Sequence, residues 1–353
     1  MGIWGQTMRI YDEHLNKESA AYVESTGQSD SLIVVFSPIN LPRGKFGLSR
    51  FFKKRIENIL FINSPGNQWF QRDIEGINNL ITSIVCEKRI ETIFYYGASM
   101  GAYGALLFSS LRKDGPCLAY GPNIILGEIG SHSSRYNIDF DEKYTDITSY
   151  FSKSEFRSTV IFGAYDLVDF YYFRYTKRRL DKLNITNNNV DLHLMDSCHN
   201  VHQHLYNLGE VNKLLGDFIS SKPVKNIISY PIKGEEIEME KLSNYDIWKQ
   251  FLSNVLAPDF EFFFHDVGDH FYFARIMFEK EDYSSAANSL TTAIDMISNC
   301  EVKKALPLGY RGKFYFLRAQ SLRKNGDSMA MRDYQACLEM NYKTDACVRY
   351  LGQ

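Results

Sequence analysis

Residues 92–105 read Thr-Ile-Phe-Tyr-Tyr-Gly-Ala-Ser-Met-Gly-Ala-Tyr-Gly-Ala, and this stretch decides the fold that we expect. An apolar, strand-like run ends at Gly97, and a run compatible with a helix begins at Met100. A strand that leads at once into a helix leaves a sharp turn, with Ser99 at its centre. Gly97 and Gly101 stand two residues before and two after the serine, where a Cβ would clash with neighbouring backbone. The pattern therefore predicts a serine held above the end of a strand.

The first 220 residues alternate short apolar runs with segments of helical length. Residues 73–88 carry apolar side chains at the spacing of one helical face. Most runs of strand length are continuous and apolar, as in strands buried on both faces; besides 92–97 they are residues 31–37, 58–63, 116–120 and 159–163. Residues 190–195 form a last run of strand length, in which Asp191 and His193 interrupt the apolar residues. Strands that alternate with helices predict an α/β fold with a mostly parallel sheet flanked by helices. Functional sites in such sheets lie at the carboxyl ends of the strands.

Two further candidate residues follow strands in the same way as Ser99. A serine hydroxyl needs a base to become nucleophilic, and the base needs a carboxylate that orients it. Asp166 follows the strand expected at 159–163, and His199 follows the one expected at 190–195. Ser99, Asp166 and His199 are therefore predicted to form a catalytic triad.

Alternatives to this assignment remain open. Asp169 competes with Asp166, and either carboxylate could instead cap the following helix. His202 competes with His199. The cluster His199, His202 and His204 also has the composition of a zinc site, but no ligand precedes it, and we predict no metal.

The motifs Gly97-Ala98-Ser99-Met100-Gly101, Gly163-x-x-Asp166 and Cys198-His199 carry a family resemblance. Residues 1–220 resemble an α/β-hydrolase. The continuation Ser-Met-Gly-Ala-Tyr-Gly-Ala and the pair His199-Asn200 are similar, more narrowly, to the hydrolase-like O-acetyltransferases and esterases found with bacterial capsule and surface-polysaccharide enzymes.

This resemblance implies how an oxyanion would be bound. One backbone N–H comes from the residue after the nucleophile, here Met100. A second comes from the loop after an earlier strand, here Ser37-Pro38-Ile39. Because Pro38 has no N–H, Ile39 or Ser37 would have to donate.

The resemblance also implies acyl transfer through an acyl-enzyme on Ser99, with a sugar hydroxyl of a surface polysaccharide or other glycan as acceptor. Acetyl-CoA is the expected donor, and no tightly bound cofactor is expected. Two alternatives stay open: a carboxylesterase or deacetylase that acts on an ester substrate, and a non-catalytic protein that binds partners through its C-terminal helices. The triad alone does not distinguish transfer to a sugar from transfer to water.

Other residues near these strands are candidates for binding. Trp69 could stack on a sugar face, and Ser37 could contact substrate. His132 and Arg135, in a possible cap over residues 123–156, could bind an anionic acceptor or the phosphates of coenzyme A.

The composition changes after residue 221. Residues 222–241 contain two prolines, a glycine and four glutamates and are expected to form a linker. They separate a domain at 1–221 from a helical domain at 242–353. There, residues 273–297 and 314–340 are loosely self-similar and resemble tetratricopeptide repeats.

The whole chain has 353 residues and a net charge of −2, which excludes general attraction to nucleic acid. The first 20 residues lack the features of a secretory signal, and no apolar run approaches the ~18 residues of a membrane span. The six cysteines show no CxxC spacing and fit a reducing compartment. We expect a cytoplasmic protein without a transmembrane segment.

Overall fold

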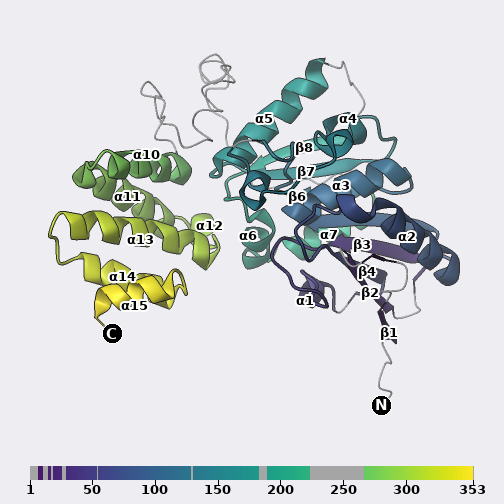
Figure 1. The fold of residues 1–353 in the computed structure, drawn as a ribbon, viewed down its shortest axis with the longest axis horizontal. Coiled ribbons are helices and arrows are strands. Elements are labelled where there is room, and N and C mark those ends of the chain that lie inside the picture. Colours follow the sequence, from purple (N-terminus) through teal and green to yellow (C-terminus); the bar gives the residue numbers. More distant parts are fainter. Residues whose placement is uncertain are drawn as a thin grey trace. The chain divides into compact units, whose positions relative to one another are not determined.

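The computed structural model describes residues 7–10, 15–16, 19–25, 29–53, 55–128, 130–182, 189–222 and 266–352. These residues form a sheet flanked by helices and a set of C-terminal helices (Figure 1). Apart from Lys222, the predicted linker at 222–241 lies outside the described residues, as does the first part of the predicted helical domain.

Contacts between Cα atoms divide the described residues into two compact units. The α/β unit contains the residues up to 162 together with 168–194 and 216–222. The helical unit contains residues 266–352 and also two stretches from the earlier part of the chain, 163–167 and 195–215. These two stretches follow two strands of the sheet, and they carry Asp166 and His199.

The sheet has eight strands among the described residues, in the order β1-β2-β4-β3-β5-β6-β7-β8. The strands are β1 (Thr7–Ile10), β2 (Ala20–Ser25), β3 (Ser31–Phe36), β4 (Asn58–Asn63), β5 (Thr92–Ala98), β6 (Cys117–Tyr120), β7 (Ser158–Gly163) and β8 (Val190–Met195). From β4 through β3, β5 and β6 to β7, neighbouring strands pair in parallel. β1 with β2, and β2 with β4, pair antiparallel. The predicted mostly parallel sheet is confirmed.

The central strands are buried on both faces, which explains their continuous apolar runs. Every residue of β4 is buried, and five of the six residues of β3 are. Phe36 on β3 stacks on Phe108 with ring centroids 5.2 Å apart. Phe94 on β5 contacts Phe218 at 5.7 Å. The core of the α/β unit therefore lies where helices cover β3 and β5.

The helices that flank the sheet differ in length. The longer ones are α2 (Ile74–Lys88), α3 (Met100–Arg112), α5 (Leu167–Lys182) and α7 (Val211–Ile219), whereas α6 (Val201–Asn207) belongs to the helical unit. Short helical turns occupy the loops: α1 (Ser49–Phe52), η2 (Gln71–Asp73), η3 (Ser133–Tyr136), η4 (Glu142–Tyr144) and α4 (Thr148–Phe151). α2 covers nearly all of the helix predicted at 73–88.

The C-terminal region is all helical where it is described, as predicted. Its helices are α10 (Val267–Glu279), α11 (Tyr283–Ser298), α12 (Glu301–Lys304), α13 (Leu308–Lys324), α14 (Ala330–Glu339) and α15 (Thr344–Leu351). α10 packs on α11, α11 on α13, α13 on α14 and α14 on α15. Small residues, such as Ala286 and Ala330, are buried at these crossings. In the described part of the chain, no helix is long and apolar enough to cross a membrane.

Candidate active site

Ser99 occupies the turn between β5 and α3 and adopts an unusual backbone conformation. Its φ is 55° and its ψ is −121°, a region that residues with a side chain rarely populate. Its N–H donates a hydrogen bond of 2.8 Å to the carbonyl of Tyr120 at the end of β6. The serine is partly exposed, whereas its neighbours Ala98 and Met100 are buried. The sheet thus holds the strained turn and leaves its central residue accessible.

The glycines on either side of the turn are required by close backbone contacts. A Cβ built on Gly97 would lie 2.1 Å from the carbonyl oxygen of Gly101. A Cβ on Gly101 would lie 2.1 Å from the carbonyl oxygen of Phe36 on β3. Both distances are far below van der Waals contact, and the obstructing atoms belong to the backbone. The structure therefore gives the physical reason for the Gly-x-Ser-x-Gly spacing.

The first turn of α3 provides backbone donors beside Ser99. The N–H groups of Ala102 and Tyr103 both donate to the Ser99 carbonyl, at 2.9 and 3.2 Å. The N–H groups of Met100 and Gly101 precede this hydrogen-bond ladder, as do the first N–H groups of any helix. The helix dipole adds partial positive charge at the same end. This arrangement suits an oxyanion that develops next to Ser99.

Ser37 is engaged elsewhere and does not supply the second oxyanion donor. Its N–H donates to the carbonyl of Ile62 at 2.8 Å, and its Oγ accepts from the N–H of Gly47 at 3.0 Å. The side chain is fully buried. Both the substrate-binding role and the donor role predicted for Ser37 therefore give way to a structural one. Ile39, which is partly exposed, remains the candidate for the second donor.

Trp69 has a packing role in place of the predicted contact with a sugar. Its side chain is only 1% exposed. The indole ring meets Tyr136 and Phe140 edge-on, with ring centroids 5.4 and 5.5 Å apart. A stacking residue needs an open ring face, and this ring holds the surrounding loops together instead.

Asp166 and His199 lie close together at the ends of β7 and β8. The backbone of the two loops is joined by a hydrogen bond of 2.8 Å from the Tyr165 N–H to the Ser197 carbonyl. A Cβ on Gly163 would lie 2.2 Å from the Cys198 carbonyl, so glycine is what allows this approach. A carboxylate oxygen of Asp166 and a ring nitrogen of His199 lie within 4.8 Å of each other. The pair has the composition and proximity of a carboxylate that orients a histidine.

The alternative residues have different surroundings. Asp169 is fully buried in the first turn of α5, and its carboxylate lies within 4.8 Å of a ring nitrogen of His132. Burial lowers the pKa of His202 to about 4, so this side chain is neutral at physiological pH. Both ring nitrogens of His204 are engaged, with Ser197 Oγ at 2.9 Å and the Val302 carbonyl at 2.7 Å.

These contacts bear on metal binding. Among the described residues, each of the pairs Asp166–His199 and Asp169–His132 offers two ligand atoms within its own unit. A catalytic zinc takes three protein ligands and a structural zinc four. His204 has no ring nitrogen left for a metal.

The C-terminal helices contact the two loops, which sequence reasoning missed. The Tyr310 hydroxyl donates to the Tyr165 carbonyl at 3.4 Å, and the Leu167 N–H donates to the Tyr272 hydroxyl at 3.5 Å. The bond between His204 and Val302 belongs to the same set. The partners stand 98 to 145 residues apart in the chain, so no local pattern could have indicated them.

No family model matches the chain, and no curated protein matches it either. Among solved structures, the chain is similar to an esterase of Pyrococcus furiosus, with 17% identity, 63% of this chain and 95% of that chain covered, and a TM-score of 0.47. It is also similar to the capsule O-acetyltransferase of Neisseria meningitidis serogroup A in complex with CoA, with 13% identity, coverage of 56% and 92%, and a TM-score of 0.39. A third similar structure is dipeptidyl peptidase 4 of Porphyromonas gingivalis, with 15% identity, 60% of this chain and 36% of that chain covered, and a TM-score of 0.44.

Proposed function

We propose that this chain catalyses acyl transfer through an acyl-enzyme on Ser99. The observation that carries the proposal is the strained turn at Ser99, which is kept between two glycines that cannot be replaced without a backbone clash. Strain of this kind costs about 1–3 kcal/mol and is found mainly at functional sites. A tight turn needed only for packing could carry glycine at position 99 without that cost.

The proposed mechanism assigns one task to each residue. A ring nitrogen of His199 accepts the hydroxyl proton of Ser99 while Oγ attacks the acyl carbonyl carbon. Asp166 orients the imidazole and stabilises its protonated form. The N–H groups of Met100 and Ile39 bind the oxyanion of the tetrahedral intermediate. His199 then gives its proton to the leaving group, and an acceptor hydroxyl attacks the acyl-enzyme by the same steps in reverse.

For the acceptor we propose a sugar hydroxyl of a glycan, with acetyl-CoA as the acyl donor. The sequence resemblance described above supports this finer assignment. Whether the acceptor is a sugar or water depends on how well the pocket excludes water and binds the sugar. An esterase uses the same acyl-enzyme, and the second experiment below separates the two reactions.

The nucleophile is tested first, by covalent labelling of the full chain. A fluorophosphonate probe should label wild-type protein once, and peptide mass spectrometry should place the label on Ser99. Ser99→Ala should abolish labelling. Ser83→Ala is the matched control, because Ser83 is a half-buried serine of α2, and it should leave labelling unchanged. Labelling that persists in Ser99→Ala would refute the assignment.

The acyl group and its acceptor are tested next. Incubation with acetyl-CoA should give a protein heavier by one acetyl group in wild type and not in Ser99→Ala. Addition of candidate glycans should then discharge the acyl-enzyme faster than buffer does and yield an O-acetylated sugar. Discharge to free acetate alone, at a rate that no glycan changes, would favour the esterase.

A further inference from the structure

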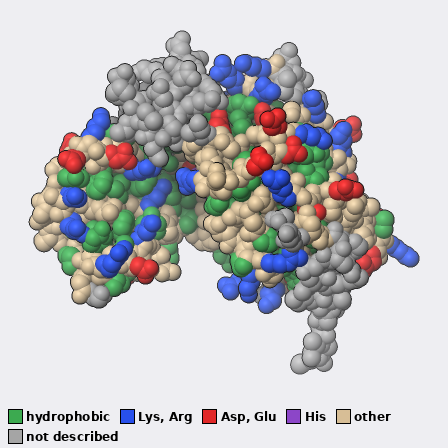
Figure 2. All heavy atoms as spheres, in the orientation of Figure 1, with side chains coloured by type: hydrophobic (Ala, Val, Ile, Leu, Met, Phe, Trp, Pro, Cys, Tyr) green, Lys and Arg blue, Asp and Glu red, His purple; other side chains and the backbone are tan. Residues whose placement is uncertain are grey.

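Helix α13 is the most basic of the helices that the structure describes in the helical unit. It contains five basic residues and no acidic one: Arg311, Lys313, Arg318, Arg323 and Lys324. On the face shown in Figure 2, basic side chains alternate with hydrophobic ones across the middle of the C-terminal helices. Five like charges on one helix repel each other unless each finds a partner. Their partners therefore show which of them is available to a ligand.

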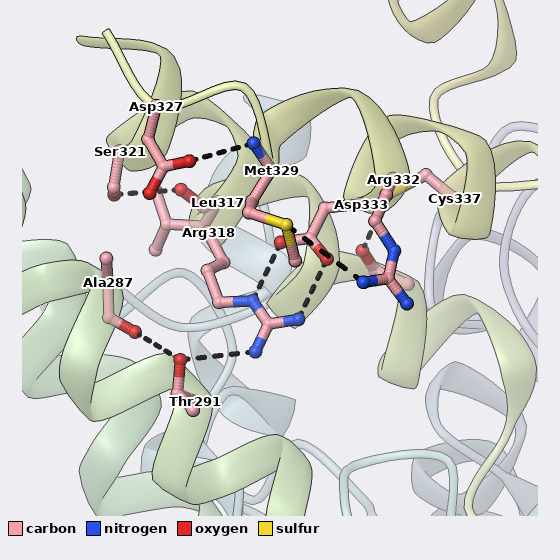
Figure 3. A network of polar contacts seen from close by, with 11 residues as sticks. Ala287, Thr291, Leu317, Arg318, Ser321, Asp327, Met329, Arg332, Asp333 and Cys337 are labelled. Carbon is pink, nitrogen blue, oxygen red and sulfur yellow. Dashed lines mark hydrogen bonds and ion pairs between the residues drawn. The ribbon is translucent and has the colours of Figure 1, made fainter. Parts of the chain in front are cut away.

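Arg318 is fully committed to structure. Its Nε and Nη2 donate to the two carboxylate oxygens of Asp333 at 2.7 and 2.8 Å, a bidentate pair (Figure 3). Its Nη1 donates to Thr291 Oγ1 at 3.2 Å. Asp333 is 5% exposed, so this ion pair ties α13, α14 and α11 together inside the helical unit.

Three other cations of α13 lie over aromatic rings. Lys313 Nζ is 3.8 Å from the ring centre of Tyr310 and 4.1 Å from that of Phe271. The Arg323 guanidinium lies 4.3 Å from the ring centre of Tyr350. Lys324 Nζ lies 5.8 Å from the ring centre of Tyr283. Each of these cations has an intramolecular partner.

Arg311 is the exception within the part of the chain that the structure describes. Its side chain makes no hydrogen bond or ion pair there, and its Nε is buried without a partner. A buried donor without an acceptor costs about 1–3 kcal/mol, more when the group is charged. Arg318, seven residues later on the same helix, has the carboxylate of Asp333 as its partner. Arg311 has no such carboxylate among the described residues.

Arg311 lines a cavity of about 220 Å³ within the helical unit. Ser298 at the end of α11, Lys304 at the end of α12 and Tyr315 on α13 supply further polar groups. Ile294, Ile297 and Met340 form the apolar part of the wall. The lining therefore carries two positive charges and no carboxylate.

We propose that this cavity binds an oxyanion, a carboxylate or phosphate group, on a short apolar stem. The planar guanidinium of Arg311 matches either group with two parallel hydrogen bonds. The two isoleucines and Met340 cover the stem. The cavity is smaller than the ~300–1,000 Å³ of sites for drug-sized ligands, so it suits one charged group and a few carbons. Binding would give the buried Nε of Arg311 the acceptor that it lacks in the described structure.

Lys304 lies at the rim of the cavity. Its Nζ pairs with Glu301 Oε1 at 2.6 Å, but the Glu301 side chain is 88% exposed. Exposed ion pairs contribute little to stability, so an incoming anion can compete for this lysine. Arg311, and not Lys304, should therefore dominate affinity.

The test follows the methyl groups of the cavity wall in the full-length protein, with isoleucine and methionine methyl groups labelled for NMR. The probes are n-butyl phosphate, butyrate, inorganic phosphate and, as the uncharged control, butanol. The methyl signals of Ile294, Ile297 and Met340 should shift saturably on addition of n-butyl phosphate or butyrate and should not shift with butanol. Tighter binding of n-butyl phosphate than of butyrate assigns the bound group as phosphate, and the reverse order assigns it as carboxylate. Inorganic phosphate should bind more weakly than n-butyl phosphate.

Variants connect these shifts to Arg311. Arg311→Met keeps the aliphatic part of the side chain and should weaken binding at least about tenfold. Lys324→Met removes the same charge from the same helix and should change affinity less than twofold. The site is refuted if no anion shifts the three methyl signals or if Arg311→Met binds as tightly as wild type. Should Arg311→Met fail to fold, the comparison of n-butyl phosphate and butyrate with butanol on wild-type protein decides whether the cavity binds an anion. Equal binding of inorganic phosphate and butyl phosphate would refute the apolar stem.

Discussion

The turn that carries Ser99 and the loops that carry Asp166 and His199 are held in different ways. All the close contacts described for the turn come from the α/β unit: Gly101 packs against β3, and the Ser99 N–H bonds to the end of β6. The stretches 163–167 and 195–215, which contain these loops, bond to each other and to the C-terminal helices, through Tyr310, Tyr272 and Val302. The nucleophile is thus built into the sheet, whereas the geometry of the acid–histidine pair depends on the helical unit.

This difference connects the C-terminal helices to the candidate active site. The stretches 163–167 and 195–215 belong to the helical unit by their contacts, although strands of the sheet precede both. A change in these helices should therefore reach Asp166 and His199 before it reaches Ser99. The following predictions test that ordering.

The largest effect is expected at the turn itself. Gly101→Ala places a Cβ only 2.1 Å from the Phe36 carbonyl oxygen. Both atoms are fixed to backbone within the sheet and α3, so a large rearrangement would be needed to relieve the clash. We expect a loss of more than about 4 kcal/mol in the free energy of unfolding, or no soluble protein. Urea unfolding measures it. The control is Gly216→Ala in α7, where the new Cβ meets nothing within 4 Å and should stabilise by about 0.5–1 kcal/mol. Equal midpoints for Gly101→Ala and wild type would refute the argument.

His204→Ala should have the next largest effect. It removes a buried ring that bridges Ser197 and Val302, and it leaves polar groups without partners, at a cost of about 2–4 kcal/mol. Hydrogen exchange should accelerate in residues 197–200 and 302–305 while the β5–α3 turn keeps its protection. Asn207→Ala removes an exposed hydrogen bond of 2.8 Å to the Ala305 carbonyl and should change little. Equal acceleration at the turn would show that the two regions are not held separately.

The stability of the loops should also depend on pH. Burial lowers the pKa of His202 to about 4, and burial also lowers the pKa of His204. The unfolded chain binds these protons near pH 6.5, so the free energy of unfolding falls as pH drops from about 6.5 to 4. At pH 5 the loss from His202 is about 2 kcal/mol. Urea unfolding at pH 7 and pH 5 should show a smaller difference in His202→Gln than in wild type, and an unchanged difference would contradict the prediction.

The smallest effect is expected for Tyr310→Phe. The hydroxyl that it removes donates to the Tyr165 carbonyl over a long 3.4 Å. We expect a loss of about 1 kcal/mol or less in the free energy of unfolding, and less than a twofold change in the rate at which fluorophosphonate labels Ser99. A loss of unfolding free energy as large as that of His204→Ala would mean that Tyr310 contributes as much as His204 to holding the loop that carries Asp166.

Much of the sheet could be predicted because its central strands are buried on both faces. Continuous apolar runs at 31–37, 58–63 and 92–97 correspond to β3, β4 and β5. The strand β2 has the sequence Ala-Ala-Tyr-Val-Glu-Ser, whose apolar run is short and half alanine, and it was not predicted. Its antiparallel pairing with β4 depends on contacts about 40 residues along the chain, which a local pattern does not record.

The candidate site was predictable to the same extent. The Gly-x-Ser-x-Gly turn is local, and the steric reason for Gly97 lies within the motif, whereas that for Gly101 involves Phe36 on β3. The burial of Trp69 and the hydrogen bonds of Ser37 depend on distant loops and were not foreseen. The hydrogen bonds of Val302 with His204 and of Tyr310 with Tyr165 link residues that are 98 and 145 positions apart. Local spacing of residue types does not indicate contacts over such distances in the chain.

The backbone angles of Ser99 have a consequence for how this sequence is maintained. At φ 55° and ψ −121°, a glycine would relieve strain of about 1–3 kcal/mol, more than the ~0.5–1 kcal/mol that its extra freedom in the unfolded chain removes. Ser99→Gly should therefore melt at a higher temperature than wild type. Folding stability alone would thus favour glycine at this position, and the proposed role of Ser99 as nucleophile would account for the serine.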